Sequence, residues 1–282
     1  MNHLNFNKIF TAAEKGKACD LLAEASGLSK SRIKRAMSKG AVWLGRGGTK
    51  QRRIRRATYE IRPGDQLALY YDEAVLSRKA PDPVCIKDFK QYSVWFKPSG
   101  LLTQGTRHGD HCALTRQAEA YFKPRRNIFI VHRIDRETAG LVLLCHNPKA
   151  ASRFSGLFQR REIEKCYDVR VRGDLRCQGE HGEIRFSLDG KTTRTRYQCI
   201  SYNPDTNESR VHAEIMTGRT HQIRRHFDMI GHPVVGDPRY GDRNKNRTGL
   251  RLVAKSLAFI RPFKRRPISI RIDPENLPTP PV

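Results

Sequence analysis

The sequence has few acidic residues and no long apolar run. Its 282 residues include 54 Lys and Arg but only 28 Asp and Glu, so the formal net charge is +26 at pH 7. Such an excess repels itself in a folded chain and usually indicates a polyanionic partner, with nucleic acid favoured over an anionic membrane surface. No segment approaches the roughly 20 apolar residues of a membrane-spanning helix, and the N-terminal residues lack a secretory pattern. We therefore expect a cytoplasmic protein with no membrane partner.

Paired metal-binding motifs are also missing. The seven cysteines are scattered without a CxxC pair, which predicts reduced thiols rather than a disulfide framework. The ten histidines include no HExxH motif, and we expect no metal site. A chain with 38% hydrophobic residues can nevertheless bury a sizeable core.

Composition and turn residues suggest five parts along the chain. We expect a lead-in at residues 1–16, a basic unit at 17–72, a linker at 73–87, a larger domain at 88–270 and a tail at 271–282. The linker is inferred from two prolines, which block a helix and weaken a strand. The larger domain is expected to be rich in short strands.

The basic unit has features of a nucleic-acid-binding surface. Ser29 is placed to cap a helix, because its hydroxyl can accept a hydrogen bond from the first helical turn. From residue 30 to residue 56 the chain has eleven Lys or Arg and no acidic residue. A solvated face without a partner is the alternative, but so unrelieved a run favours contacts with phosphates. The expected contacts are Lys30, Arg32, Lys34, Arg35, Arg52, Arg53, Arg55 and Arg56.

Four segments of the larger domain have the residues of a reaction centre. HRIDRETAG at 132–140 places Asp135 between two arginines, just before a glycine and an apolar strand. A lone aspartate of this kind would be assigned to a surface ion pair, so the other segments decide its interpretation. They are KPSG at 97–100, KCY at 165–167, and TGRTHQIRRH at 217–226 followed by GHPVVGDPRYG at 231–241.

Taken in this order, the four segments resemble the RluA-type pseudouridine synthase family over about residues 88–262. The basic unit, with SKSRIKRAMSKGAVWLG followed by IRPGDQL, resembles the RNA-binding domain named after ribosomal small-subunit protein four. The resemblance implies an α+β protein. A small α/β RNA-binding domain would precede a catalytic domain with a large, mostly antiparallel sheet.

The resemblance also implies a role for each matched residue. Asp135 would attack the target nucleotide, and Arg219 would pair with this carboxylate and keep it ionised. Tyr167 would stack on the base and serve in proton transfer, while Arg133 would fill the space left by the flipped nucleotide. Leu252 is expected to form an apolar wall of the uracil pocket, and Lys97, His221 and Arg224 are expected to contact RNA phosphate. The chain has Leu252-Val-Ala where the family usually has Leu-His-Ala, and we expect this departure to affect local packing only.

The implied reaction needs no cofactor, because uridine is isomerised without oxidation or group donation. The glycosidic bond breaks, the uracil rotates, and the bond reforms through carbon five. A carboxylate can attack the sugar, attack the base or deprotonate a sugar carbon, and the sequence does not choose among these routes.

Several alternatives compete with this interpretation. The expected substrate is ribosomal RNA of the large subunit, with transfer RNA as the alternative, and the excess charge favours a monomer. A different class is a non-catalytic RNA-binding or ribosome-assembly protein, which the combination of Asp135, Tyr167 and Arg219 disfavours. An RNA methyltransferase would need a glycine-rich loop after a strand, but Gly45-Arg-Gly-Gly lies in the small basic unit.

Overall fold

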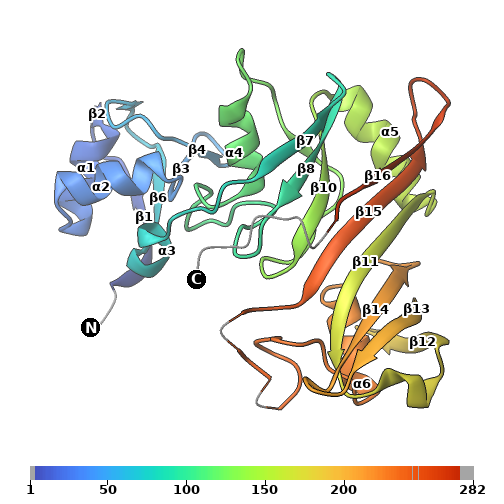
Figure 1. Cartoon of the computed structure of the whole chain (residues 1–282). Helices are drawn as coiled ribbons and strands as arrows, with labels where there is room; N and C mark the ends of the chain where they lie inside the picture. The colour runs from blue at the N-terminus through green and yellow to red at the C-terminus, as the bar shows by residue number, and fades with distance from the viewer. Residues whose placement is uncertain (1–3, 243, 247, 274–282) are drawn as a thin grey trace. The chain divides into compact units, whose positions relative to one another are not determined.

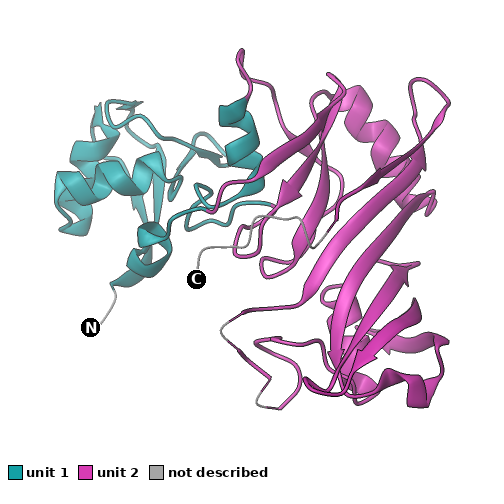
Figure 2. Ribbon diagram, in the orientation of Figure 1, with its two compact units in different colours: residues 1–80, 104–121 teal, residues 81–103, 122–282 magenta. Residues whose placement is uncertain are grey.

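The computed structural model describes residues 4–242, 244–246 and 248–273, and it divides into two compact units (Figure 2). Unit 1 consists of residues 1–80 and 104–121, and unit 2 of residues 81–103 and 122–282. These bounds differ from those expected, because residues 104–121 fold with the N-terminal unit rather than with the larger domain around them. Most of the expected C-terminal tail lies outside the described residues.

Unit 1 is built on a four-stranded sheet in the order β1-β6-β3-β4 (Figure 1). Residues 1–16 were expected to be a lead-in outside the basic unit, and this prediction is wrong. They contain β1, all seven residues of which pair antiparallel with β6. The buried core joins helices to sheet through side chains such as Leu22, Ile33, Met37 and Leu69. The elements of this unit are β1 (Asn5–Thr11), β2 (Gly16–Lys17), α1 (Ala18–Ser26), α2 (Lys30–Ser38), β3 (Val42–Gly45), β4 (Arg52–Arg53), β5 (Glu60–Ile61), β6 (Gln66–Asp72), α3 (Glu73–Ser77) and α4 (Leu114–Tyr121).

Local chemistry explains why α2 forms with its basic face outward. The Ser29 hydroxyl accepts a hydrogen bond from the Arg32 amide at 3.4 Å, which confirms the predicted cap. Ile33, Ala36 and Met37 follow a helical spacing and are buried, so the basic residues between them are left on the exposed side.

Unit 2 contains a ten-stranded sheet with the order β12-β13-β14-β11-β15-β10-β8-β7, to which β16 adds on β15 and β9 on β10. β10 pairs with β15 in parallel, and the other pairings recorded in this sheet are antiparallel. The elements are β7 (Val84–Asp88), β8 (Tyr92–Lys97), β9 (Phe129–Ile130), β10 (Ala139–Cys145), α5 (Pro148–Gln159), β11 (Ile163–Arg172), η1 (Leu175–Gln178), β12 (His181–Leu188), β13 (Lys191–Asn203), β14 (Glu208–Ile215), α6 (Gln222–Met229), β15 (Leu252–Ile260) and β16 (Pro267–Arg271).

The parallel join between β10 and β15 depends on a glycine. Gly140 has φ 126°, and a Cβ there would lie 2.4 Å from both the amide nitrogen and the carbonyl oxygen of Ala254. Only a residue without a side chain allows the two backbones to approach so closely. The first two residues of β10, which follow the Asp135 loop, thereby lie beside β15.

The expected linker at 73–87 contains regular structure. α3 begins it, with the Asp72 carboxylate accepting from the Val75 amide at 2.9 Å, and β7 begins before it ends. The two prolines lie between these elements, where neither a helix nor a strand is interrupted. No helix in the described part of the chain is long and apolar enough to cross a membrane.

Candidate active site

The loop that contains Asp135 precedes β10 and is held through its backbone. The Thr103 hydroxyl donates to the Ile134 carbonyl at 2.8 Å and accepts from the Ile134 amide at 3.2 Å. The Ser99 hydroxyl donates to the Glu137 carbonyl at 2.7 Å, and the Gly100 amide donates to the Arg136 carbonyl at 2.8 Å. Residues 97–103 thus fix the backbone on both sides of Asp135.

Lys97 belongs to the same support and does not face RNA. Its side chain is fully buried, and Nζ donates to the carbonyls of Pro98 at 3.0 Å, Leu101 at 2.7 Å and Arg136 at 3.2 Å. Burial lowers the pKa of Lys97 to about 7, while three carbonyl acceptors favour the ammonium form because only that form has three N–H donors. The expected phosphate contact is therefore wrong.

Arg224 on α6 is the arginine that meets the Asp135 carboxylate. Its Nη1 lies 3.3 Å from Asp135 Oδ2, while Nε and Nη2 bind the two Asp237 oxygens at 2.6 and 2.8 Å. Burial works against the charge of Arg224, but the hydrogen bonds and charge of Asp237 outweigh it and raise the pKa of the guanidinium. Since Arg224 is 1% exposed, the expectation that it contacts phosphate is also wrong.

Arg219 does not make the ion pair predicted for it. Its side chain is exposed, and within the described residues no carboxylate lies at ion-pair distance from it. Its backbone amide donates instead to Gln222 Oε1 at 3.2 Å, which shapes the turn before α6. Asp237 had no predicted role, although a buried arginine between Ile223 and Phe227 on the inner face of α6 calls for an acidic partner.

A small cavity of about 70 Å³ brings most of the predicted site residues together. Of the eight catalytic and substrate-binding residues, all except Lys97 line it, and they come from the Asp135 loop, β11, α6 with the turn before it, and the start of β15. Within the described residues, no group of three or more His, Cys, Asp or Glu side chains could hold a metal ion. The predicted residues in the wall are Arg133, Asp135, Tyr167, Arg219, His221, Arg224 and Leu252.

Tyr167 and His221 are both neutral in this cavity. Burial, together with the nearby Asp135 charge, raises the pKa of Tyr167 above its usual range, so its hydroxyl stays protonated at pH 7. Burial lowers the pKa of His221, whose Nε2 lies 3.8 Å from Asp135 Oδ2. His221 Nδ1 is 3.1 Å from the Tyr240 hydroxyl, so the ring faces the carboxylate and not an outer phosphate surface.

The basic residues of unit 1 differ in how much of their charge is available. Arg55 Nη2 is hydrogen-bonded to Asp110, and Arg53 lies 3.5 Å from the same carboxylate while stacking on the Trp43 ring. These two arginines therefore hold residues 104–121 inside unit 1. Arg32 and Lys30 pair with acidic residues at the surface, and Arg35 donates to a backbone carbonyl. Exposed basic side chains without a carboxylate partner among the described residues remain at Lys34, Arg52 and Arg56.

Comparisons with known proteins agree on one family. The RNA pseudouridylate synthase family model matches residues 91–229. The dual-specificity RNA pseudouridine synthase RluA of Vibrio parahaemolyticus is 34% identical over 188 residues, which cover 59% of this chain and 73% of that protein. Ribosomal large subunit pseudouridine synthase C of Vibrio vulnificus is 28% identical over 86% of this chain and 83% of its own length.

A solved structure is similar in fold. Human RNA pseudouridylate synthase domain containing 1 superimposes with a TM-score of 0.60 at 22% identity, covering 71% of this chain and 87% of its own. The family model spans the Asp135 loop, β11 and α6, the segments that supply most of the cavity wall. With a 34% identical relative matched over most of that relative's length, the chain belongs to the RNA pseudouridine synthase family of enzymes.

Proposed function

We propose that this enzyme isomerises uridine to pseudouridine in ribosomal RNA of the large subunit, with Asp135 as the essential carboxylate. The observation that carries the proposal is a carboxylate in a small cavity, 3.3 Å from a buried arginine and beside a buried tyrosine and a leucine. The choice of ribosomal RNA is supported by the relative from Vibrio vulnificus, whose name assigns it to the large ribosomal subunit and which matches 86% of this chain.

Asp135 supplies the electron pair that the reaction requires. A guanidinium that donates to a carboxylate fixes the position of that carboxylate. Arg224 donates to Asp135 at 3.3 Å, and its bidentate contact with Asp237 fixes the direction from which it approaches Asp135. The carboxylate attacks the sugar or the base, or removes a sugar proton, and the glycosidic bond then breaks and reforms through carbon five.

The cavity wall holds the uracil while it rotates. A base inside a stem must leave the stack, at a cost of a few kcal/mol, and aromatic and apolar side chains offset that cost by stacking on it. Tyr167 and Leu252 provide these surfaces from adjacent strands, paired through Val169 and Leu252. The protonated Tyr167 hydroxyl acts as a hydrogen-bond donor, and exposed Arg133 at the rim fills the space that the nucleotide vacates.

Unit 1 serves as an RNA-docking module. Its α2 presents a basic outer face over an apolar inner face, and the sequence of α2 through β3 resembles the RNA-binding domain of ribosomal small-subunit protein four. Side chains of this kind track phosphates and fix the position of a folded RNA without reading its bases.

A pseudouridine map of total RNA tests the proposal. Cells lacking the gene are complemented with the parent, with Asp135→Asn, or with Asp189→Asn as a control at an exposed aspartate. We expect a discrete site in large-subunit RNA to be lost, then restored by the parent and the control but not by Asp135→Asn. An unchanged map, or equal restoration by Asp135→Asn, would contradict the catalytic assignment.

Transfer RNA is the second candidate substrate. The relative from Vibrio parahaemolyticus carries a name that states dual specificity, and it matches 59% of this chain. The same map covers transfer RNA, so an Asp135-dependent site found only there would replace the ribosomal assignment and leave the catalytic one intact.

A further inference from the structure

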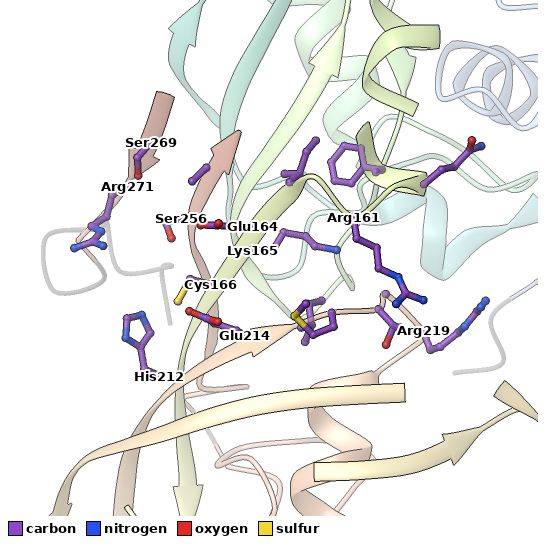
Figure 3. A pocket seen from close by; sticks show the side chains of 18 residues that line it. Arg161, Glu164, Lys165, Cys166, His212, Glu214, Arg219, Ser256, Ser269 and Arg271 are labelled. Carbon is purple, nitrogen blue, oxygen red and sulfur yellow. The ribbon is translucent and has the colours of Figure 1, made fainter. Parts of the chain in front are cut away.

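A second, larger cavity of about 470 Å³ adjoins the Asp135 cavity within unit 2 (Figure 3). It forms where β11 and β14 part, because their pairing begins at Cys166 with Glu214 and the chain beyond Glu214 turns away toward α6. Ile215, Gly218 and Arg219 line both cavities. A ligand that extends out of the Asp135 cavity therefore meets this second one directly.

One end of this cavity is lined by cations. Figure 3 shows the side chains of Arg161, Lys165 and Arg219 toward one end, and the carboxylates of Glu164 and Glu214 toward the other. Throughout the described ranges, no carboxylate lies at ion-pair distance from any of these three cations. The charges of this end are thus not balanced by the protein itself.

Lys165 is the most confined of the three cations. Its amine lies 5.8 Å from the centre of the Phe158 ring, and a Cβ at Gly218 would lie 3.9 Å from the same amine. Burial lowers the pKa of Lys165, and no nearby charge offsets this effect. A partly desolvated ammonium without a counter-ion is unfavourable, and an anion brought to it would remove that penalty.

Arg161 is directed to the cavity by an unusual backbone conformation. It follows α5 with φ 60°, and the Arg161 and Glu162 amides donate to the carbonyls of Phe158 at 3.2 Å and Leu157 at 2.9 Å. This is the hydrogen-bond pattern of a helix end at which glycine is usual, because an L-side chain is strained there. The chain tolerates this strain while placing a guanidinium at the cavity.

We propose that Arg161, Lys165 and Arg219 bind a backbone phosphate of the substrate RNA, adjacent to the uridine that occupies the Asp135 cavity. The proposal rests on the proposed function, since it takes the ligand of the first cavity to be a nucleotide. Phosphate oxygens are the anions that RNA presents on either side of every base, and Lys and Arg are their usual partners. The shared wall at Gly218 and Arg219 brings a phosphate next to the flipped nucleotide within reach of all three cations.

Binding of a short RNA tests this site without turnover. The probe is a fluorescein-labelled decamer of cytidines with one central uridine, titrated with the full chain over a series of KCl concentrations. We expect Lys165→Met to weaken binding by about tenfold and to lower the salt slope by about 0.7, the value for one phosphate contact on a single strand. Lys149→Met, at an exposed position on α5 outside both cavities, is the control and should bind as the parent does.

Arg161→Gly separates binding from folding. Glycine accepts the backbone conformation at this position, so the melting temperature should be unchanged or higher, while RNA binding becomes weaker. A purely structural arginine would give the opposite pair of results, lower stability with unaltered binding, and that outcome would overturn the proposal.

Neutral methylphosphonate links identify the ligand as a phosphate of the RNA. One link at a time is replaced along the decamer, and we expect a single position next to the uridine to weaken binding by the parent. A neutral link at that position should not weaken RNA binding by Lys165→Met any further, because this variant already lacks the contact. Equal losses for parent and variant at every position, parent-like binding by Lys165→Met, or no measurable binding of the decamer by the parent would each overturn the proposal. Failure here leaves Asp135-dependent modification of cellular RNA unaffected, so it is distinguishable from a failure of the proposed function, which the pseudouridine map would show.

Discussion

Arg224 is shared between two carboxylates, and its contact with Asp237 places a buried ion pair beside Asp135. It binds Asp237 through two hydrogen bonds and reaches Asp135 with its remaining nitrogen. Asp237 is itself 1% exposed, so neither partner of that pair is stabilised by water. Removal of one charge would leave the other buried and unbalanced.

Arg224→Gln should therefore lower the free energy of unfolding by about 3–5 kcal/mol and abolish pseudouridine formation. Arg219→Gln is the matched control, because the same change at an exposed position five residues earlier in the chain leaves no buried charge unpaired. Urea unfolding measures both variants. A larger loss of stability for Arg219→Gln than for Arg224→Gln would contradict the observed pairing.

Lys97→Met tests the support of the Asp135 loop. The change removes the donor for three carbonyls, and we expect the free energy of unfolding to fall by about 3 kcal/mol, at roughly 1 kcal/mol or more for each unsatisfied group. We also expect kcat to fall while the Kd for RNA is unchanged, with Lys87→Met on the exposed part of β7 as the control. Weaker RNA binding with unchanged stability would instead favour a phosphate contact.

The sequence allowed the members of the site to be predicted better than their contacts. Seven predicted residues line one cavity, but the partner of Asp135 is Arg224 and not Arg219. The error has a geometric cause. His221 has φ 54° and directly precedes α6, which begins at Gln222. Each residue turns a helix by about 100°, so spacing in the sequence cannot decide which arginine points inward until the start of the helix is known.

At the scale of elements, the contact between β10 and β15 positions the Asp135 loop. Gly140→Ala would place a Cβ against backbone atoms of Ala254, which cannot move aside as a flexible side chain can. We expect the free energy of unfolding to fall by about 3 kcal/mol or more, in the range of severe backbone and packing conflicts.

Gly190→Ala provides the control for this prediction. Gly190 has φ 71° but no atom within 4 Å of a new Cβ, so only the backbone strain of about 1–2 kcal/mol applies. Chemical denaturation of both variants measures the difference between them. Equal losses would mean that the close approach of the two strands is not what makes glycine necessary at position 140.

Regular elements with local signals could be predicted from the sequence, and those defined by distant contacts could not. The cap at Ser29 and the apolar run in β10 are local features, and both appear in the structure. Residues 104–121 join unit 1 through contacts such as the hydrogen bond from Trp43 Nε1 to the Arg107 carbonyl at 3.0 Å. No periodicity within that segment indicates such a partner, which explains why the unit boundary was misplaced.

At the scale of the whole molecule, half-buried His132 and buried His226 make the free energy of unfolding depend on pH. Burial lowers the pKa of His132 to about 3 and that of His226 to about 4. The His132 ring accepts a hydrogen bond from the Leu143 amide, and the His226 ring is hydrogen-bonded to the Thr193 hydroxyl. The unfolded chain binds protons at these histidines below pH 6.5, whereas the folded chain does not until pH 3–4. The contribution of these two histidines to the free energy of unfolding is therefore fully present above pH 6.5 and is lost as the pH falls toward 4.

His226→Gln should flatten this dependence. At pH 5.5 the parent should have lost about 1 kcal/mol through His226 relative to pH 7.5, and the variant should lack that loss. The measurement is urea unfolding at a series of pH values, with His181→Gln on the exposed part of β12 as the control. A variant whose pH dependence matches that of the parent would remove His226 from this account.

The net charge of +26 predicts RNA binding that weakens steeply with salt. Replacing Lys34, Arg52 and Arg56 with Gln should weaken binding of ribosomal RNA and lower the salt slope by about 2, with little change in melting temperature. Arg55→Gln should instead lower the melting temperature, because Asp110 loses a partner inside unit 1. An unaltered salt slope in the triple variant would exclude unit 1 as the docking surface.

The parallel pairing of β10 with β15 also decides when during its own synthesis the enzyme can become active. Leu252 in the cavity wall and Ala254 against Gly140 are made long after the Asp135 loop has left the ribosome. A nascent chain that ends before β15 has its carboxylate but lacks the strand against which the loop is placed. The Asp135 cavity is therefore complete only once β15 has been made, so a nascent chain that ends before Leu252 lacks part of the cavity wall.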